Sequence, residues 1–251
     1  MTKLEEKDAD GRRELAEVKP SPEEIIASMG LHVMSPEEEA EQERKERQAE
    51  EDARKSQRLS WYRSASSGVP ERYWMEGLDT FNATDEETGH ALKKARDFAG
   101  SAGCRVLILC GKPGTGKTHL GCGIVRERGG IYTPMLRLVY EADSTMSYKA
   151  RETKIQLLDR LCSTPMLVLD ELGRAKVRED YQKELASYII GERYANGKPT
   201  VLISNLPKGE LLAWLGEAVI DRLRECAEET VEMTGATYRM TKRGEVFGDE
   251  A

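Results

Sequence analysis

The residues best suited to chemistry lie at positions 111–118, in a glycine-rich segment that ends in Lys117 and Thr118. The segment reads Gly-Lys-Pro-Gly-Thr-Gly-Lys-Thr and fits the phosphate-binding pattern G-x-x-x-x-G-K-[ST]. Its glycines allow backbone N–H groups to turn inward toward phosphate oxygens. Lys117 would reach the β- and γ-phosphates, and the Thr118 hydroxyl would ligate Mg²⁺. The segment therefore predicts a site for a nucleoside triphosphate.

The flanking sequence supports this interpretation, because the pattern is informative only between a strand and a helix. An apolar run at 106–110 predicts a buried parallel strand, and a helix is expected at about 118–127. The positive end of that helix would add to the attraction for phosphate. A chance match to a glycine-rich turn is the alternative. The expected nucleotide-binding residues are Gly111, Lys112, Pro113, Gly114, Thr115, Gly116, Lys117, Thr118 and His119.

A pair of carboxylates, Asp170 and Glu171, follows a second apolar run at 166–169. Asp170 would hold the Mg²⁺ through its water shell. Glu171 would orient and deprotonate a water for in-line attack on the γ-phosphate. Two acidic residues after a strand are weak evidence alone, because a surface turn can look the same. Downstream of a phosphate loop, the Asp-Glu order favours hydrolysis over transfer to a small acceptor.

Three further polar residues could contact a nucleotide. Asn205 follows a predicted strand at 200–203, and in a parallel sheet it would lie between the phosphate loop and the acidic pair. Its amide could polarise the attacking water, although Asn is also common at strand ends. Arg222 lies on a predicted helix and would need assembly to reach a neighbouring subunit's γ-phosphate. Arg239 could bring a second cation to the nucleotide of its own subunit.

Composition narrows the class of protein. The chain has 251 residues, 39% hydrophobic and 33% charged, which fits one α/β domain with a smaller appendage. No apolar run approaches the length of a membrane span, and the N-terminus lacks the apolar stretch of a secretory signal. Five scattered cysteines fit reduced thiols and argue against a zinc site or a disulfide framework. We therefore expect a cytoplasmic protein without membrane contact. The net charge of −7 does not by itself indicate nucleic-acid binding, although a local basic stripe is compatible with it.

Strands and helices alternate beyond the phosphate loop. Strands are expected near 130–132, 166–169, 200–204 and 230–233. Helices are expected near 85–99, 135–142, 146–162, 180–194, 209–214 and 217–224. Pro134 leaves the end of the second strand in doubt. Strands separated by helices of this length predict a parallel sheet with helices on both faces.

The first 68 residues differ in composition from the rest. Residues 1–20 are polar and are expected to be disordered. Ser21 and Ser35 each precede Pro-Glu-Glu, which predicts a short helix and then a longer, charge-dense one to about Arg63. That helix is either a solvated spacer or a docking arm for another protein. A small-residue linker follows, and aromatic residues gather just beyond it. We therefore predict an N-terminal helical partner-docking region at 1–68 and a nucleotide-binding domain at 69–251.

Five motifs, in this order and spacing, resemble the AAA+ ATPases of the DnaC helicase-loader and IstB group. They read G-K-P-G-T-G-K-T, L-V-L-D-E-L-G, K-P-T-V-L-I-S-N-L, L-G-E-A-V-I-D-R-L-R and T-Y-R. The resemblance covers about 69–240 and includes the linker G-V-P-E-R-Y. It implies an α/β P-loop NTPase of the AAA+ type, with a parallel sheet flanked by helices and a small charged helical region before it.

The resemblance also assigns roles. By position, Asn205 matches sensor 1, Arg222 the arginine finger and Arg239 sensor 2. Lys117, Glu171 and these three residues would then carry catalysis, with Thr118 and Asp170 at the metal and ATP with Mg²⁺ as cofactors. The family implies assembly of several copies into an open ring or spiral on binding ATP and DNA.

A DNA contact is implied in the segment 140–154, which corresponds loosely to the family's helical insertion that faces DNA. The candidate residues there are Tyr148, Lys149, Arg151 and Lys154. A tyrosine among cations could stack on a base of single-stranded DNA. An amphipathic surface helix without DNA contacts is the alternative.

Three functions compete at this point. A helicase loader and an IstB-like transposition helper share the same motor and differ in their partner. A small-molecule kinase would not need Glu171, Asn205 and Arg222 together. The charged arm and the G-V-P-E-R-Y linker favour the loader, whose N-terminal region would contact a hexameric replicative helicase. This preference rests on analogy, because the motor does not distinguish the first two functions.

Overall fold

The computed structural model describes residues 5–7, 13–15, 34–101, 103, 105–235 and 237. The chain divides into two units, Met1–Arg54 and Lys55–Ala251. In the first unit, strands β1 (Glu5–Lys7) and β2 (Arg13–Leu15) pair antiparallel. The short helix expected after Ser21 lies outside the described residues.

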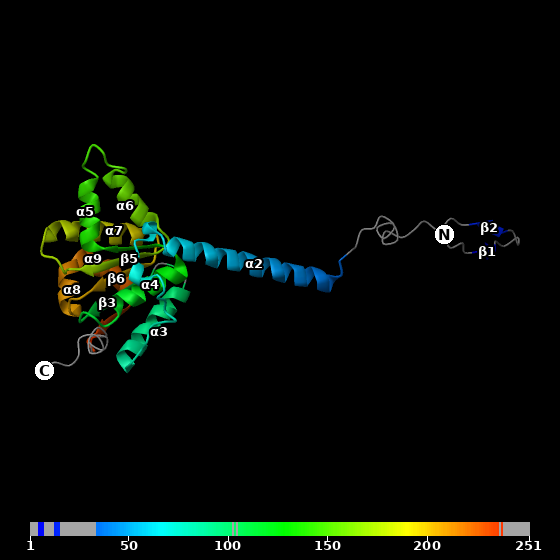
Figure 1. Ribbon diagram of the computed structural model, residues 1–251, viewed down its shortest axis with the longest axis horizontal. Coiled ribbons are helices and arrows are strands. Elements are labelled where there is room, and N and C mark those ends of the chain that lie inside the picture. Colours follow the sequence, from blue (N-terminus) through cyan, green and yellow to red (C-terminus); the bar gives the residue numbers. More distant parts are fainter. Residues whose placement is uncertain are drawn as a thin grey trace. The chain divides into compact units, whose positions relative to one another are not determined.

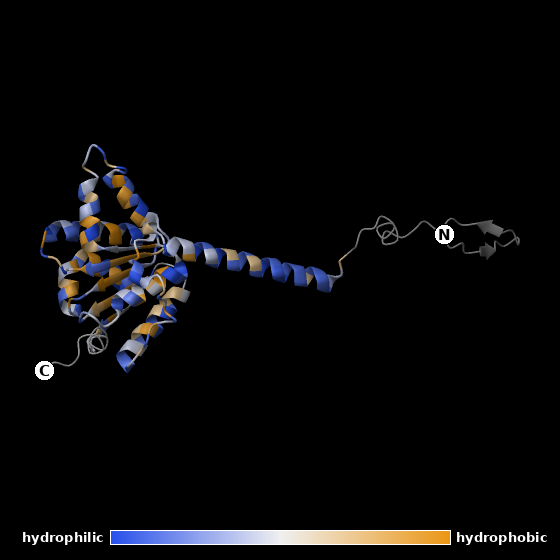
Figure 2. Ribbon diagram, in the orientation of Figure 1, coloured by the Kyte–Doolittle hydropathy of each residue, from blue (hydrophilic) through white to orange (hydrophobic). Residues whose placement is uncertain are grey.

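Helix α2 (Pro36–Tyr62) begins where the sequence predicted. The Ser35 hydroxyl accepts a bond from the Glu38 N–H, and the Glu38 carboxylate accepts one from the Ser35 N–H at 2.8 Å. This reciprocal capping satisfies N–H groups that the first turn leaves without a partner. Ion pairs one turn apart, such as Lys45 with Glu41, run along an exposed and hydrophilic surface (Figure 2).

The second unit begins within α2, so the boundary after residue 54 precedes the predicted one after residue 68. The reason is burial: Tyr62 and Val69 both belong to the hydrophobic core beneath them. The predicted small-residue linker contains a short 3₁₀ helix, η1 (Ala65–Ser67), and a second one, η2 (Glu71–Tyr73), follows directly after it. Gly68 between them has a φ of 73°, and a Cβ there would lie 2.0 Å from the Tyr132 carbonyl oxygen. Such a close approach to the sheet requires glycine.

Five parallel strands form the sheet of the second unit, in the order β4-β5-β6-β3-β7 (Figure 1). Their bounds are β3 (Val106–Gly111), β4 (Ile131–Pro134), β5 (Leu167–Leu172), β6 (Thr200–Ser204) and β7 (Ala227–Met233). Pro134 does not interrupt β4, because it is the last residue of the strand and the N-cap of the next helix. The predicted α/β class with a parallel sheet is confirmed.

Helices cover both faces of this sheet. They are α3 (Glu86–Gly100), α4 (Lys117–Arg128), α5 (Met135–Ser144), α6 (Lys154–Ser163), α7 (Glu179–Ala195), α8 (Lys208–Leu215) and α9 (Glu217–Cys226). Alternate strand residues point to opposite faces. Ile108 packs with α5–α9, whereas Leu107 packs with α3, α4 and the end of α2. The sheet is thus the middle of three layers.

One predicted helix was wrong. Instead of a single helix over 146–162, the chain makes turns after residue 145, and α6 begins only at Lys154. Thr153 caps α6 and forms a capping box with Gln156, which sets the start of the helix there. Residues 146–153 therefore form an exposed connection between α5 and α6. Among the residues that the structure describes, no helix has both the length and the apolarity needed to cross a bilayer.

Candidate nucleotide-binding site

Three loops meet at the carboxyl edge of the sheet. The phosphate loop follows β3, the acidic pair ends β5, and Asn205 follows β6. Because β6 lies between β5 and β3, Asn205 lies between the other two, the position expected for a parallel sheet. Lys117, Asp170 and Glu171 line the same cavity as Asn205, which has a volume of about 710 Å³. The structure therefore brings these sequence-predicted residues to one site.

The ammonium group of Lys117 is buried inside the phosphate loop, with only 4% of the residue exposed. Its Nζ donates to the carbonyl oxygens of Gly111 at 2.8 Å and Lys112 at 2.5 Å, and lies 3.3 Å from the Thr115 hydroxyl. The residue is also the first of α4, where the positive end of the helix dipole points. The loop and the start of the helix together place a cation and the positive end of a helix dipole at the point where phosphate would bind.

Glycine is required at one turn of this loop. Gly116 has a φ of 98°, and a Cβ at this position would lie 2.6 Å from the ring of Phe81. Phe81 lies before α3 and lines the same cavity. The loop thus packs directly against a segment far away in sequence, which side chains at Gly116 would prevent.

The Asp170 carboxylate is buried and accepts three hydrogen bonds. Its Oδ2 atom accepts from the Thr118 hydroxyl at 2.8 Å and from the Tyr132 hydroxyl at 2.7 Å. Its Oδ1 atom accepts from the Glu171 N–H at 2.6 Å. Oxygen donors of this kind suit Mg²⁺, which binds few protein groups and completes its shell with phosphate oxygens and water. Thr118 and Asp170 therefore fit the predicted metal.

Tyr132 was missed by the sequence analysis, because a tyrosine within a short apolar strand gives no sign that its hydroxyl meets a carboxylate on the next strand. Burial, and then the nearby Asp170 charge, raise the pKa of Tyr132 far above its usual value. The phenol therefore stays protonated and acts as the donor to Asp170.

Glu171 is held in an unusual conformation and forms an ion pair. Its backbone has a φ of 61°, and the pairing of β5 with β6 shifts register between Leu169 and Leu172. The Glu171 carboxylate bonds to the guanidinium of Arg174, which also lines the cavity. Arg174 was not predicted, although a cation three residues after the acidic pair was a signal that could have found it.

Another part of the cavity wall is built by η2, by the segment between η2 and α3, and by one residue of α4. Its lining residues there are Arg72, Tyr73, Glu76, Phe81, Asn82 and His119. Of these, only His119 was predicted to bind nucleotide, although the aromatic residues after the linker marked the region. Because residues 72–82 hold no phosphate-binding or acidic motif, the sequence did not connect this segment with the phosphate loop.

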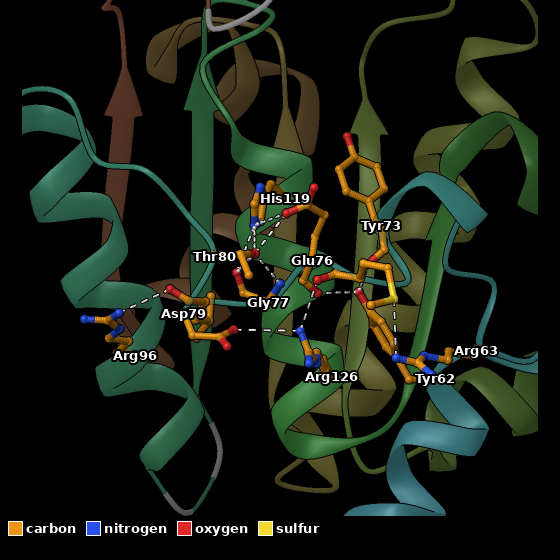
Figure 3. A network of polar contacts seen from close by, with 12 residues as sticks. Tyr62, Arg63, Tyr73, Glu76, Gly77, Asp79, Thr80, Arg96, His119 and Arg126 are labelled. Carbon is orange, nitrogen blue, oxygen red and sulfur yellow. Dashed lines mark hydrogen bonds and ion pairs between the residues drawn. The ribbon is translucent and has the colours of Figure 1, made fainter.

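His119 joins this segment to the phosphate-loop helix (Figure 3). Its Nε2 atom lies 2.8 Å from the Gly77 carbonyl oxygen, and because a carbonyl only accepts, this nitrogen carries a proton. The ring of Phe81 meets His119 edge-on at a centroid distance of 5.2 Å. Glu76 accepts a bond from the Thr80 hydroxyl, and both lie near the same imidazole nitrogen. The cavity wall is thus tied to α4.

The same network reaches the end of α2. The Tyr62 hydroxyl lies 2.7 Å from the Tyr73 carbonyl oxygen and 3.2 Å from that of Glu76 (Figure 3). Arg126 of α4 lies 3.8 Å from the Asp79 carboxylate. The last turn of α2 therefore supports the backbone of residues that line the cavity.

Of the two predicted arginines, Arg222 is not among the described residues that line this cavity. Arg222 is exposed on α9, where its guanidinium lies close to Gly191 of α7. The neighbouring Arg224 pairs instead with Asp221 at 3.9 Å. Arg239, the predicted sensor 2, lies outside the described residues.

The predicted DNA-binding residues are only partly grouped. Tyr148, Lys149 and Arg151 are exposed on the connection between α5 and α6, and the Tyr148 side chain is free of packing at 105% exposure. Lys154 is separate, because it begins α6 and its Nζ lies 4.9 Å from the centre of the Tyr181 ring.

Comparison with known proteins matches residues 37–246 to a family described as IstB-like ATP binding protein. The replicative helicase loader DnaC of Escherichia coli (strain K12) is 29% identical over 189 residues, which cover 72% of this chain and 76% of that protein. The crystal structure of the DnaC helicase loader is similar with a TM-score of 0.57 and 29% identity, covering 66% of this chain and 100% of that one. The replication initiator DnaA bound to AMPPCP and single-stranded DNA shares the fold, with a TM-score of 0.56 at 17% identity, over 70% of this chain and 56% of that one. The family match spans all five strands of the parallel sheet.

Proposed function

Because this chain belongs to the IstB-like ATP-binding protein family and is a DnaC-type AAA+ protein, we propose that it loads a replicative DNA helicase onto single-stranded DNA by hydrolysing ATP. The observation that carries the proposal is the convergence of the phosphate loop, the acidic pair and Asn205 around one cavity. Members of this family are ATPases, and the arrangement has the parts that phosphoryl transfer to water needs.

ATP binding would use side chains that the phosphate loop already holds in place. Lys117 would exchange its bonds to main-chain carbonyls for stronger, charge-assisted bonds to phosphate oxygens. Thr118 can donate its hydroxyl proton to Asp170 while its oxygen ligates the metal. When bound, Mg²⁺ would neutralise charge on the β- and γ-phosphates.

Hydrolysis would begin with a water held by Glu171 and Asn205. Glu171 takes a proton as the water oxygen bonds to the γ-phosphorus, and the bond from that phosphorus to the β–γ bridging oxygen breaks. Glu171 first has to leave Arg174, which occupies its carboxylate. A neighbouring subunit's Arg222 would stabilise the transition-state charge, so assembly and hydrolysis would be linked.

The contacts with a helicase and with DNA would be made by exposed, polar segments of the chain. Residues 1–68, with the exposed and charged helix α2, would dock on a hexameric replicative helicase. Tyr148, Lys149 and Arg151 would contact single-stranded DNA once several subunits repeat them along a strand. The protein would form a homo-oligomer on binding ATP and DNA, and it would act in the cytoplasm.

A direct test measures loading. The protein is mixed with a hexameric helicase and a single-stranded circle, and unwinding of an annealed oligonucleotide reports loaded helicase. We expect unwinding to require this protein and ATP, and to be lost with Lys117→Ala. Unwinding that is equal with and without the protein would contradict the loader function.

An IstB-like transposition helper is the second candidate, because the matching family model is named for IstB. It shares the motor, so the ATP site does not separate the two. Affinity capture with the full chain carrying Glu171→Gln, held with ATP, tests the partner directly. Recovery of a transposase without a helicase would favour the helper, and recovery of the helicase would favour the loader.

A further inference from the structure

One buried hydroxyl contacts the metal-site residues without belonging to any of the recognised motifs. Tyr132 pairs with Val168 in the register of β4 with β5, and Asp170 is the next residue of β5 on the same face. Such diagonal neighbours are within reach of an aromatic side chain. The Tyr132 hydroxyl spans the gap and lies 2.7 Å from Asp170 Oδ2, with 4% of the residue exposed.

The acceptor capacity of Asp170 limits how it can meet a metal. An ionised carboxylate has about four acceptor positions. Three are filled, by the hydroxyls of Thr118 and Tyr132 and by the N–H of Glu171. One position is left, on Oδ1, and a metal-bound water can take it without displacing any of these donors.

We propose that Tyr132 is a positioning residue for the magnesium site, which orients Asp170 so that the carboxylate holds Mg²⁺ through water. The inference rests on the proposed ATP-binding function and adds a residue to it. The Thr118 hydroxyl, which would ligate the metal, donates to the same oxygen, Asp170 Oδ2. By holding that oxygen in place, Tyr132 would also orient the Thr118 hydroxyl. Hydrogen-bonded partners of this kind set the orientation of metal ligands in many sites.

Packing alone does not account for the hydroxyl. A phenylalanine would fill nearly the same space between β4 and α4 without burying a polar group. The hydroxyl needs an acceptor, and the structure provides it at the carboxylate of Asp170. Removing only this oxygen therefore separates the proposed role from the contribution of the ring.

The test uses the full chain with Tyr132→Phe and fluorescently labelled ADP as the probe. ADP affinity is measured in EDTA and at increasing Mg²⁺, and thermal unfolding is recorded without nucleotide. We expect unchanged affinity in EDTA and a rise of about tenfold in the Mg²⁺ concentration that half-maximally strengthens binding. The matched control is Tyr181→Phe, which removes the hydroxyl of a half-buried tyrosine on α7 that packs against the core on the other face of the sheet and does not line the cavity. It should keep the Mg²⁺ requirement of the parent protein.

Three results would overturn the inference. They are an unchanged Mg²⁺ requirement in Tyr132→Phe, an equal loss of affinity with and without Mg²⁺, or the same rise in Tyr181→Phe. A parent protein that binds no ADP under any condition would instead contradict the proposed function and remove the inference with it. The behaviour of the parent protein therefore distinguishes the two failures.

Discussion

At the scale of single residues, Glu171 combines a strained backbone conformation with a proposed role as the base of ATP hydrolysis. Its φ of 61° lies in the left-handed region, which is costly for residues other than glycine. Glu171 lines the cavity, and Arg174 binds its carboxylate there. A subunit by itself therefore holds the proposed base in an ion pair, and the base would act only after that pair opens.

We expect Arg174→Ala to raise ATP turnover by the isolated protein, because Glu171 would no longer be held by a cation. The guanidinium is mostly exposed, so the pair contributes at most about 1 kcal/mol and the increase should not exceed about fivefold. Steady-state phosphate release at low protein concentration provides the measurement. Glu171→Gln is the control: it should bind ATP and release almost no phosphate. Lower turnover in Arg174→Ala would mean that Arg174 assists the reaction.

At the scale of elements, Arg193 of α7 connects the end of α6 with the start of β6 through hydrogen bonds. It is fully buried, and its guanidinium donates to the carbonyl oxygens of Leu161, Cys162 and Thr164 at the end of α6. It also bonds to Pro199 and to the Thr200 hydroxyl at the start of β6. A cation at the carboxyl end of a helix satisfies its last carbonyls and opposes the negative end of its dipole.

Arg193→Met should therefore be strongly destabilising, since it leaves several buried carbonyls without donors. We expect a loss of about 3 kcal/mol or more in the free energy of unfolding, measured by urea denaturation. Arg224→Met is the matched control, because Arg224 is mostly exposed and makes one long ion pair. Its effect should stay within about 0.5 kcal/mol. Equal stability of the two variants would show that the buried network contributes little.

The connection between α5 and α6 carries the proposed DNA contacts. Lys149→Glu with Arg151→Glu should abolish ATP-dependent binding of single-stranded DNA and leave basal hydrolysis unchanged, because neither residue lines the ATP cavity. Anisotropy of a labelled oligonucleotide measures this, and the parent's affinity should fall as salt rises. The exposed Lys93 of α3 offers a control as Lys93→Glu. Undiminished binding by the double variant would place the DNA surface elsewhere.

At the scale of the whole molecule, the proposed role of Arg222 would leave the ATP site of an isolated subunit incomplete. The residue is exposed on α9 and does not line the cavity of its own chain. If it is the arginine finger, it can act only on a neighbour's nucleotide. The ATP site would then be finished by assembly.

Mixing variants tests this idea. Arg222→Ala should still bind ATP but lose the stimulation that comes with assembly, whereas Lys117→Ala should not turn over ATP at all. When the two are mixed, a Lys117→Ala subunit can supply Arg222 to an intact ATP site on its neighbour. We expect partial recovery of ATPase activity with a maximum at an intermediate ratio. Activity that never exceeds the sum of the separate variants would argue against a finger acting between subunits.

The sequence by itself determined the α/β class, the parallel sheet and the order of the motifs around it. These features depend on short-range patterns: apolar runs, helix caps and a glycine-rich loop followed by Lys117 and Thr118. Because parallel strands end at one edge, the loops after β3, β5 and β6 had to meet there once the strand order was right. Sequence patterns within each strand and loop were therefore enough to predict that these three loops lie together.

Only the tertiary structure decided which other residues joined them. Tyr132 and the segment 72–82 reach the site through contacts between distant parts of the chain, and such contacts leave no periodic signal. The boundary between the two structural units differs from the predicted domain boundary for the same reason. Burial of the Tyr62 side chain in the core is more favourable in free energy than its exposure on the arm. Residues 146–153 formed turns because the cap at Thr153 set the start of α6, although their composition is compatible with a helix. Side chains with several possible partners take the one that packing brings near, and only the folded chain specifies it.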